Sequence, residues 1–472
     1  MWTRRHRTKH LLIALLAVIA MLAAACGNDD DGDGGVTGGA EQQPTAAPAD
    51  EPEPAPAEEP ADEPEPADEP APAEEPADEP EPAPAEEPAD EPEPEPEPTE
   101  APPPPEPTGP PIKLMVSGSM TGGVGIPELE DGAEAAVAAI NAAGGVNGRP
   151  IELLICDDES NPNLSVECGR QAVDEGVVAV VGATSGFGNE YMGVLADAGI
   201  PSIGNLSRSQ MELSSPLSFP IGGGIAVSLA SIGYGLGENG ATTVHAAIPA
   251  TGNAAALAGL FLNAGLAPYG LSLKGQTGFP PDAADITPLV QATLEGGTDG
   301  VAFIMTPDLI NKYLLALPNL GADPLLVSST LVYSQTNFDI VGDAAEGLIL
   351  AGQILPSSYT ENPGVQRFHD DLDAIGSDAP RSELGMNTWA SFHIVAEIMR
   401  TMDPEAIDSA SLVAAMESAG EIHFEPLPPF NWAEPIMAYP PASRVFSDYV
   451  VLSEVRNGQI VALTGEYVSL TR

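Results

Sequence analysis

The 472-residue chain carries a net charge of −54, and its acids and prolines are concentrated in one segment. Residues 28–110 hold 29 of the 70 acids and 25 of the 50 prolines, with no lysine or arginine. The 362 residues from Pro111 onward carry 12 basic side chains, scattered singly, against 41 acidic ones. This pattern excludes a nucleic-acid partner, which needs clustered Lys and Arg to neutralise phosphates. Because 362 residues exceed the roughly 250 to 300 at which one core stops growing, we expect two lobes.

The first 27 residues have the pattern of an export signal. Four basic side chains precede the apolar run Leu11–Ala25, which is too short to span a bilayer comfortably. The run ends in Leu-Ala-Ala-Ala-Cys26-Gly, which resembles the lipobox of bacterial lipoproteins. The resemblance implies a signal peptide over residues 1–25 and lipidation of Cys26. The alternative interpretation is a secretory signal cut elsewhere, or an uncleaved apolar anchor.

Residues 26–110 are predicted to be a disordered tether. The sequence APAEEPADEPEP occurs three times, starting at Ala55, Ala71 and Ala83. Proline removes backbone donors and the carboxylates repel each other, so the segment has no core to form and stays extended. Its reach, at about 3.1 Å per residue, is on the order of 250 Å. A calcium-binding or partner-recruiting tail is the alternative, although scattered carboxylates do not form the 6–8 oxygen cage that tight Ca²⁺ binding needs.

From Pro111 the chain alternates short apolar runs with segments of helical periodicity. This alternation predicts an α/β fold with parallel sheets that are covered on both faces. The predicted strands are 112–116, 151–155, 177–181, 244–248, 301–305 and 325–328. The predicted helices are 130–143, 161–175, 253–264, 286–294 and 308–317.

The loops after these strands indicate the kind of site. In doubly wound sheets, ligands bind beyond the carboxyl ends of the strands. The loops there are rich in Ser, Thr, Gly and Asn, which suit a small polar ligand and supply no group for proton transfer. They begin at Ser117, Gly182, Gly204, Pro249, Thr306 and Ser328.

Three segments carry a family resemblance: Ile112–Gly122, Gly132–Glu152 with the following Asp157-Asp158, and Val178–Gly182. They are similar to the branched-chain amino acid (Leu/Ile/Val) type of ABC-transporter substrate-binding protein, which has the type I periplasmic-binding-protein fold. The resemblance implies two Rossmann-like lobes joined by three hinge crossings. Lobe 1 is then residues 111–223 and 354–446, and lobe 2 is residues 224–353 and 447–472. The likeness fades over residues 361–441, and we assign no structure there.

The resemblance also implies a set of ligand-binding residues in the strand-end loops of both lobes. Thr251 stands where family members often carry a tyrosine, and Arg208, beside the predicted site, favours a carboxylate in the ligand. The predicted ligand-binding residues are Ser119, Thr184, Ser185, Gly186, Asn205, Leu206, Ser207, Thr251, Asp308 and Thr330.

One expected acid is missing. Receptors of this type for amino acids carry a carboxylate after the strand that matches Leu325–Ser328, but this chain has Ser-Ser-Thr330 there. An ammonium buried without a counter-charge costs several kcal/mol. The binding of an α-amino acid therefore requires Asp308 to reach in from the next loop. The alternative interpretation is that Asp308 is the N-cap of the helix that follows it.

The cysteines and the glycine-rich loop do not form a metal, redox or catalytic motif. With Cys26 assigned to lipid, Cys156 and Cys168 are the remaining pair and predict a disulfide in an oxidising compartment. A metal or redox dithiol would need a nearby His or a Cys-x-x-Cys, and the chain has neither. The loop Gly182–Gly186 lacks both the Gly-x-Ser-x-Gly and the Gly-x-Gly-x-x-Gly patterns. We therefore expect no catalytic residue, no metal and no cofactor.

Taken together, the sequence predicts a monomeric, non-enzymatic receptor of an ABC importer. It is expected to be exported and lipid-anchored on the outer face of the bacterial cytoplasmic membrane. Its two lobes would close on a small polar ligand, an amino acid or a related amide or carboxylate, and present it to permease subunits. The alternatives are a ligand-sensing receptor for a signalling partner on the same fold, and an enzyme on a two-lobed α/β fold.

Overall fold

The computed structural model describes residues 106–122, 125–250 and 254–471, with the side chains of residues 336 and 338 excepted. All these residues belong to one unit of the chain. The predicted signal peptide, Cys26 and the tether up to residue 105 lie outside the described residues, as does Thr251.

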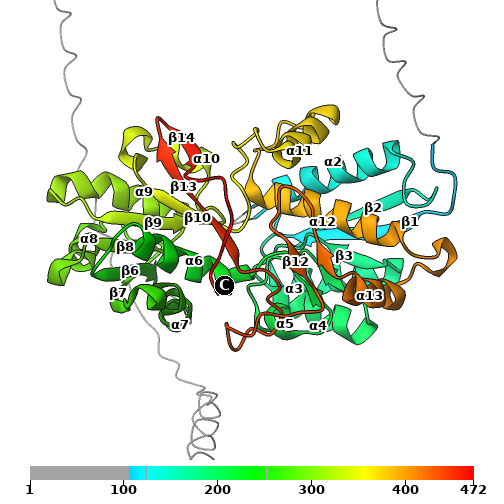
Figure 1. The fold of residues 1–472 in the computed structure, drawn as a ribbon, viewed down its shortest axis with the longest axis horizontal. Helices are drawn as coiled ribbons and strands as arrows, with labels where there is room; N and C mark the ends of the chain where they lie inside the picture. The colour runs from blue at the N-terminus through cyan, green and yellow to red at the C-terminus, as the bar shows by residue number, and fades with distance from the viewer. Residues whose placement is uncertain (1–105, 123–124, 251–253, 472) are drawn as a thin grey trace, which may run out of the picture. The chain divides into compact units, whose positions relative to one another are not determined.

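The first sheet has five parallel strands in the order β2-β1-β3-β4-β5. Its strands β1, β2 and β3 are labelled in Figure 1. Side chains alternate across it: Leu114 and Val116 face one hydrophobic cluster, whereas Met115 faces another. Both faces are therefore buried, as the apolar runs predicted. The strands are β1 (Ile112–Gly118), β2 (Ile151–Asp157), β3 (Ala179–Val181), β4 (Ser202–Ile203) and β5 (Ser218–Phe219). The helices between them are α2 (Glu128–Ala142), α3 (Pro162–Glu175), α4 (Gly188–Ala198) and α5 (Gln210–Ser214).

The second sheet has the order β14-β13-β10-β9-β8-β6-β7, and β15 pairs with β13. Strands β6 to β10 are parallel, and the antiparallel hairpin β13–β14 closes the edge next to β10. Its strands are β6 (Val244–Pro249), β7 (Leu273–Phe279), β8 (Gly300–Phe303), β9 (Leu325–Ser329), β10 (Ile349–Gly352), β13 (Tyr449–Arg456), β14 (Gln459–Ala462) and β15 (Val468–Ser469). Its α-helices are α6 (Gly224–Glu238), α7 (Ala254–Leu266), α8 (Thr287–Thr293), α9 (Pro307–Ala316) and the short α10 (Gln335–Phe338).

The region that the sequence left unassigned is mostly helical. Helices α11 (Pro363–Ala374) and α12 (Glu383–Arg400) pack against α2, and α13 (Ser409–Ser418) packs against α12. Most of the circumference of α12 is buried, so its apolar residues show no single stripe that a periodicity could reveal. The small antiparallel ribbon that follows is β11 (Glu421–Ile422) with β12 (Phe430–Asn431). Short 3₁₀ turns are η1 (Ala267–Tyr269), η2 (Glu295–Gly297), η3 (Leu317–Leu320), η4 (Gly342–Ala345) and η5 (Pro404–Ala406).

We call the first sheet with its packed helices lobe 1 and the second sheet with its packed helices lobe 2. The chain passes between them after β5, after β10 and before β13. The first two passages are joined by Gln353: its Oε1 accepts the N–H of Gly223 at 2.6 Å, and its Nε2 donates to the carbonyl of Gly224 at 3.0 Å. One amide side chain thus fixes two of the passages to each other. The boundaries drawn at residues 223, 353 and 446 stay a prediction.

Helices α2 and α12 approach each other closely at a pair of glycines. A Cβ on Gly132 would lie 2.4 Å from the carbonyl oxygen of Gly385, which is backbone and has no rotamer by which to move away. The close packing of these helices therefore depends on the missing side chain.

We predict that Gly132→Ala lowers the free energy of unfolding by about 1 to 3 kcal/mol, because the helices must separate to admit the methyl group. The measurement is the denaturant midpoint of the purified chain. The matched control is Gly193→Ala in α4, where an added Cβ meets nothing within 4 Å. This control should gain about 0.5 to 1 kcal/mol from helix propensity. Equal effects of the two substitutions would contradict the close approach.

Candidate functional site

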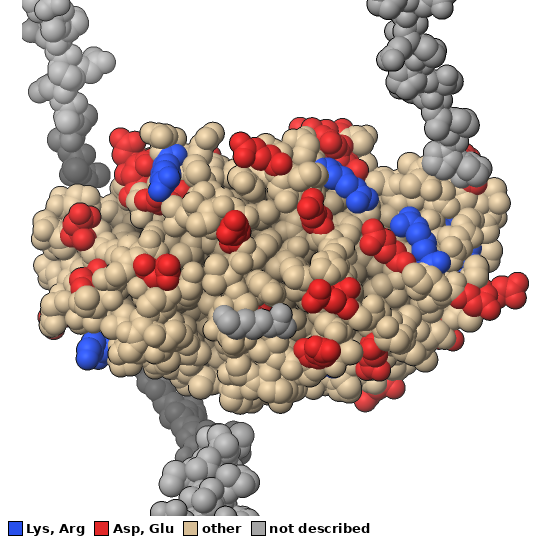
Figure 2. Space-filling model, viewed as in Figure 1, with Lys and Arg blue, Asp and Glu red and all other residues tan. Residues whose placement is uncertain are grey.

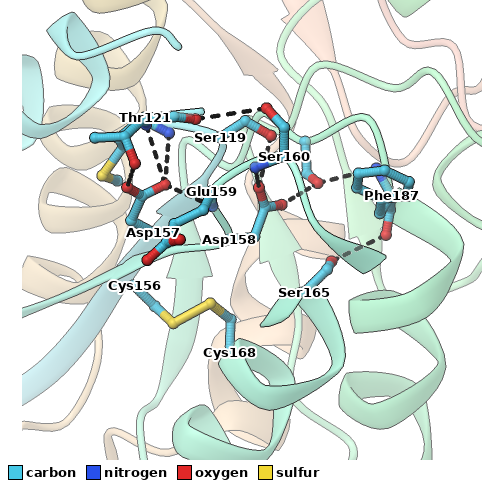
Figure 3. Close-up of a disulfide and its surroundings, with 12 residues drawn as sticks. Ser119, Thr121, Cys156, Asp157, Asp158, Glu159, Ser160, Ser165, Cys168 and Phe187 are labelled. Carbon is cyan, nitrogen blue, oxygen red and sulfur yellow. Dashed lines mark hydrogen bonds between the residues drawn. A yellow bond between two sulfur atoms is a disulfide. The ribbon is translucent and has the colours of Figure 1, made fainter. Parts of the chain in front are cut away.

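Two of the predicted hydroxyl residues meet at a buried carboxylate, Asp158 (Figure 3). The Ser119 hydroxyl donates to Oδ1 at 2.6 Å, the Ser160 N–H donates to the same oxygen at 2.9 Å, and the Ser185 hydroxyl donates to Oδ2. The Ser185 Oγ also accepts the N–H of Phe187 at 2.9 Å. A hydroxyl has one proton, so in this arrangement Ser119 and Ser185 can accept hydrogen bonds from a ligand but cannot donate to its carboxylate.

The backbone of the same loop still has donors. No hydrogen bond among the described residues occupies the N–H groups of Ser185 and Gly186, and Gly186 is exposed just before α4 begins. Thr184 is 1 % exposed, and its hydroxyl oxygen has no partner within the described part of the chain. The loop can therefore hold an anionic or acceptor group through backbone N–H groups near a helix N-terminus.

The disulfide stands directly beside this network (Figure 3). Cys156 near the end of β2 is joined to Cys168 in α3, with their Cα atoms 5.6 Å apart, which is the pair that the sequence predicted. Asp157, the next residue, accepts the N–H groups of Met120, Thr121 and Glu159. Burial by itself would raise the pKa of Asp157, but the hydrogen bonds from Thr121 and from these N–H groups lower it overall. The loop after β1 is thereby held to the end of β2.

A second buried carboxylate, Glu212, holds the loop after β4. It accepts the hydroxyl of Tyr191 at 2.8 Å and the N–H groups of Arg208 and Ser209 at 3.0 and 2.9 Å. Burial raises the pKa of Glu212. In the same loop, Asn205 Nδ2 donates to Ser207 Oγ at 3.0 Å. The conformation of the loop after β4 therefore depends on hydrogen bonds to Glu212, an acid that the strand pattern did not indicate.

The predicted loop residue Leu206 is buried, and its N–H donates to the carbonyl of Ala183 at 3.0 Å. This bond joins the loop after β4 to the loop after β3. The neighbouring Arg208 is exposed.

The predicted ligand-binding residues of lobe 2 differ in burial: Thr330 is buried, whereas Asp308 is exposed. Thr330 is 5 % exposed, and its hydroxyl has no partner among the described residues, whereas Ser329 lies 3.0 Å from Ser228 on α6. The interpretation of Asp308 as an N-cap is wrong, because α9 begins at Pro307 and its N-cap residue is Thr306. Proline is favoured in the first turn, so the helix begins earlier than the acid suggested. The exposed Asp308 pairs with Lys312 at 2.8 Å.

The cavities show which of these residues come together. Asn205 and Leu206 line a space of only about 20 Å³ with Gln353 and Asn387, which is room for about one water molecule. Cavities of about 620 and 570 Å³ are each confined to one lobe.

A cavity of about 640 Å³ is lined by both lobes, and its volume falls within the range of about 300 to 1,000 Å³ typical of ligand pockets. Lobe 1 contributes the start of α2, His369 of α11, the segment before α12 and the first residue of α12. Lobe 2 contributes α10, the preceding Ser334 and Ile460. None of the predicted strand-end residues lines this cavity.

Glu383 is a functional candidate that sequence reasoning missed. It is the first residue of α12, it lines the 640 Å³ cavity, and it is 2 % exposed. Its Oε1 accepts the N–H of Ser357 at 3.1 Å. Burial, with a smaller contribution from the charge of Glu128, raises the pKa of Glu383 to about 7. It lies where the family likeness is weakest, so no signal in the sequence pointed to it.

On the face shown in Figure 2, acidic side chains are spread over both lobes and the few basic ones stand apart. Among the described residues, no group of three or more His, Cys, Asp or Glu side chains has the arrangement of a metal site. No helix within the described ranges is long and apolar enough to cross a membrane.

With this geometry established, comparison with known proteins gives the class. The profile of the periplasmic binding protein family matches residues 111–434, which is more than half of the chain. The chain belongs to this family. Proteins of this type are exported, bind small molecules outside the cytoplasm and deliver them to ABC permeases.

Relatives of known sequence match over a short segment. The chain is 35 % identical over 92 residues to the Leu/Ile/Val-binding protein homolog 3 of Brucella melitensis, covering 19 % of this chain and 25 % of that protein. It is 39 % identical over 74 residues to the Leu/Ile/Val-binding protein of Escherichia coli K12, covering 15 % and 20 %. The matches thus span about a quarter or less of the relatives' own length.

Solved structures match over nearly their whole length. A leucine-binding protein from Thermotoga maritima aligns with a TM-score of 0.63 at 15 % identity, covering 76 % of this chain and 99 % of that one. A branched-chain amino acid transporter substrate-binding protein from Streptococcus pneumoniae, in complex with isoleucine, aligns with 0.62 at 18 % identity, covering 76 % and 99 %. A solute-binding protein from R. palustris, in complex with 4-hydroxybenzoate, aligns with 0.63 at 18 % identity, covering 76 % and 97 %. These likenesses show the type I periplasmic-binding-protein fold.

We predict that Asp158→Ala destabilises the chain by about 3 kcal/mol or more, because two hydroxyls and one N–H lose their buried acceptor. Asp158→Asn keeps an acceptor oxygen and should cost less. Ser119→Ala removes one donor and should cost about 1 to 3 kcal/mol. Denaturant unfolding of the three variants checks this order, and an Asp158→Ala variant as stable as the parent would contradict the network.

Proposed function

We propose that this chain is the solute-binding receptor of an ABC importer and that it encloses one small polar ligand between its lobes without changing it chemically. The observation that carries the proposal is the 640 Å³ cavity, because its lining comes from both lobes. A ligand that contacts both lobes stabilises the arrangement that joins them by its differential affinity, and a permease can then recognise that arrangement.

The ligand class follows from the polar groups of the two lobes. Backbone N–H groups at Ser185 and Gly186, in a strand-end loop of lobe 1 outside the lining of the cavity, suit a carboxylate or another acceptor. The structural relatives support this class, since their complexes hold isoleucine in one case and 4-hydroxybenzoate in another. Both compounds carry a carboxylate and differ at the other end. We therefore propose an amino acid or a related carboxylate or amide as the ligand.

We predict that such a compound raises the thermal midpoint of the full chain by about 5 °C or more when it is present at 100 times its Kd. The measurement is a thermal-shift screen of amino acids, their amides, simple carboxylates and polyols. Gln335→Trp, which places a bulky side chain on the wall of the cavity, should abolish the shift. Gln366→Trp on the exposed face of α11 is the matched control and should preserve it. Loss of the shift in both variants, or in neither, would place the ligand elsewhere.

We further propose that the chain acts as a monomer held at the membrane by lipid on Cys26, with residues 26–110 as the spacer. The lipobox-like sequence supports the anchor, and the proline-rich acidic composition supports the spacer.

We predict that the membrane fraction yields a mature chain that begins at Cys26 and carries acyl groups, as measured by intact mass. Cys26→Ser should release the chain from the membrane, because a serine offers no thiol to the lipid. The matched control is Thr37→Ser, a conservative change within the spacer, which should leave the chain bound. An unmodified Cys26 in the membrane fraction would contradict the anchor.

A further inference from the structure

The 640 Å³ cavity between the lobes has a buried acid in its wall. Glu383 is 2 % exposed and lines the cavity from lobe 1, and Ser334 and Asn337 line it from lobe 2. Burying a carboxyl group without a partner of opposite charge is costly. None of the ion pairs among the described residues includes Glu383.

The two basic side chains that line the cavity already have partners other than Glu383. Arg381 pairs with Asp373 at 2.5 Å, and its other terminal nitrogen donates to the carbonyls of Ser377 and Ala379. His369 Nε2 lies 2.8 Å from the carbonyl of Ser357, which it can reach only as a donor. The charged and titratable groups that line the cavity around Glu383 are Glu128 from α2, Asp339 after α10, His369 from α11, and Asp378 and Arg381 before α12. The lining therefore has acids in excess of its bases.

The position of Glu383 on α12 directs it to the strand-end loops. Residues four apart lie on the same face of a helix. Asn387, one turn after Glu383, lines the small cavity with Asn205 and Leu206, and its Nδ2 donates to the carbonyl of Gly204 at 2.8 Å. The side of α12 that carries Glu383 thus also carries a contact to the loop after β4, one turn away from the 640 Å³ cavity.

We propose that Glu383 is the counter-charge for a primary ammonium group of the ligand, bound in the cavity between the lobes. The inference rests on the proposed function and narrows its ligand class to compounds with an ammonium group. In this proposal Glu383, from lobe 1, takes the place of the acid that is missing at Ser328–Thr330 in lobe 2. The buried carboxyl then gains a partner of opposite charge, which no ion pair among the described residues supplies.

The pH dependence follows from the raised pKa. In the free protein the pKa of Glu383 is about 7, above its ordinary value, so the carboxyl is protonated below neutral pH and ionised above it. An ammonium pairs only with the ionised form, so affinity should rise from pH 6 to pH 8. At pH 7 the binding event should release protons, because some of the carboxyls are protonated beforehand.

The stability of the protein without ligand should fall as pH rises, whereas ligand affinity should increase. Between the ordinary pKa of 4.5 and the raised value of about 7, the folded chain keeps a proton on Glu383 that the unfolded chain has lost. This group therefore contributes less to stability as pH rises through that window.

The experiment is a thermal-shift screen of the full chain at pH 8 with the twenty amino acids, ethanolamine and putrescine, alongside α-hydroxy acids that match the amino acids. We expect at least one ammonium compound to bind and its hydroxy analogue to bind at least tenfold more weakly. Binding only of neutral or anionic compounds would overturn the inference and leave the proposed function standing. Binding of nothing in this screen or in the broader one would overturn both.

The hit is then titrated by calorimetry at pH 7 in phosphate and in Tris, which differ in ionisation enthalpy and so report proton release. Glu383→Gln should weaken binding tenfold to a hundredfold at pH 8 and abolish the proton release. Asp378→Asn is the matched control, since it removes an exposed carboxylate from the same cavity and should change affinity less than threefold. Unchanged affinity and proton release in Glu383→Gln would overturn the inference. Glu383→Gln also removes a buried ionisable group, so its thermal midpoint at pH 8 should be at least that of the parent and shows that the variant is folded.

Discussion

The hydrogen bonds to the carboxylate of Asp158 hold together the loops that end three strands of lobe 1. The acid itself follows β2, Ser119 follows β1 and Ser185 follows β3. Inside a protein such charge-assisted bonds are strong, and an unpaired acceptor would be costly. The positions of the backbone N–H groups in these loops therefore depend on one buried charge. The disulfide next to it connects β2 to α3 and restrains the same corner of the lobe.

Buried acids recur in this chain, and each has different surroundings. Asp158 is satisfied by two hydroxyls and one N–H, and Glu212 by a tyrosine hydroxyl and two N–H groups. Asp158 and Glu212 both have a structural role, because their hydrogen bonds fix the conformation of the loops that follow the strands. Glu383 accepts the N–H of Ser357 and stands at a cavity. Its raised pKa reflects burial that hydrogen bonds do not offset. The surroundings thus separate acids that build the site from an acid that is available to a ligand.

Six strands and five helices were predicted from local pattern close to their observed positions, whereas others such as α4, α6, β7 and β10 were not, and the site was predicted only in part. The apolar runs that became β1, β2, β6 and β9 are bounded by turns, and the family likeness located the loops after them. Those loops do come together in lobe 1. The sequence could not predict whether the hydroxyls of these loops donate or accept hydrogen bonds toward a ligand. That depends on a further residue, such as Asp158, which already takes their protons. Helix α12 was missed because it is buried on nearly all sides and shows no amphipathic stripe.

The sequence by itself determined the alternation of strands and helices, the family, and the two cysteines available to pair. These properties are local or compositional, so periods of about 2 and 3.6 residues and short motifs are enough to reveal them. Only the tertiary structure decided that Glu128, Ser334 and Glu383 line one cavity, and that Gln353 joins two passages between the lobes. These residues lie far apart in the chain. Their proximity is set by the packing of two sheets and their helices, which no local pattern encodes.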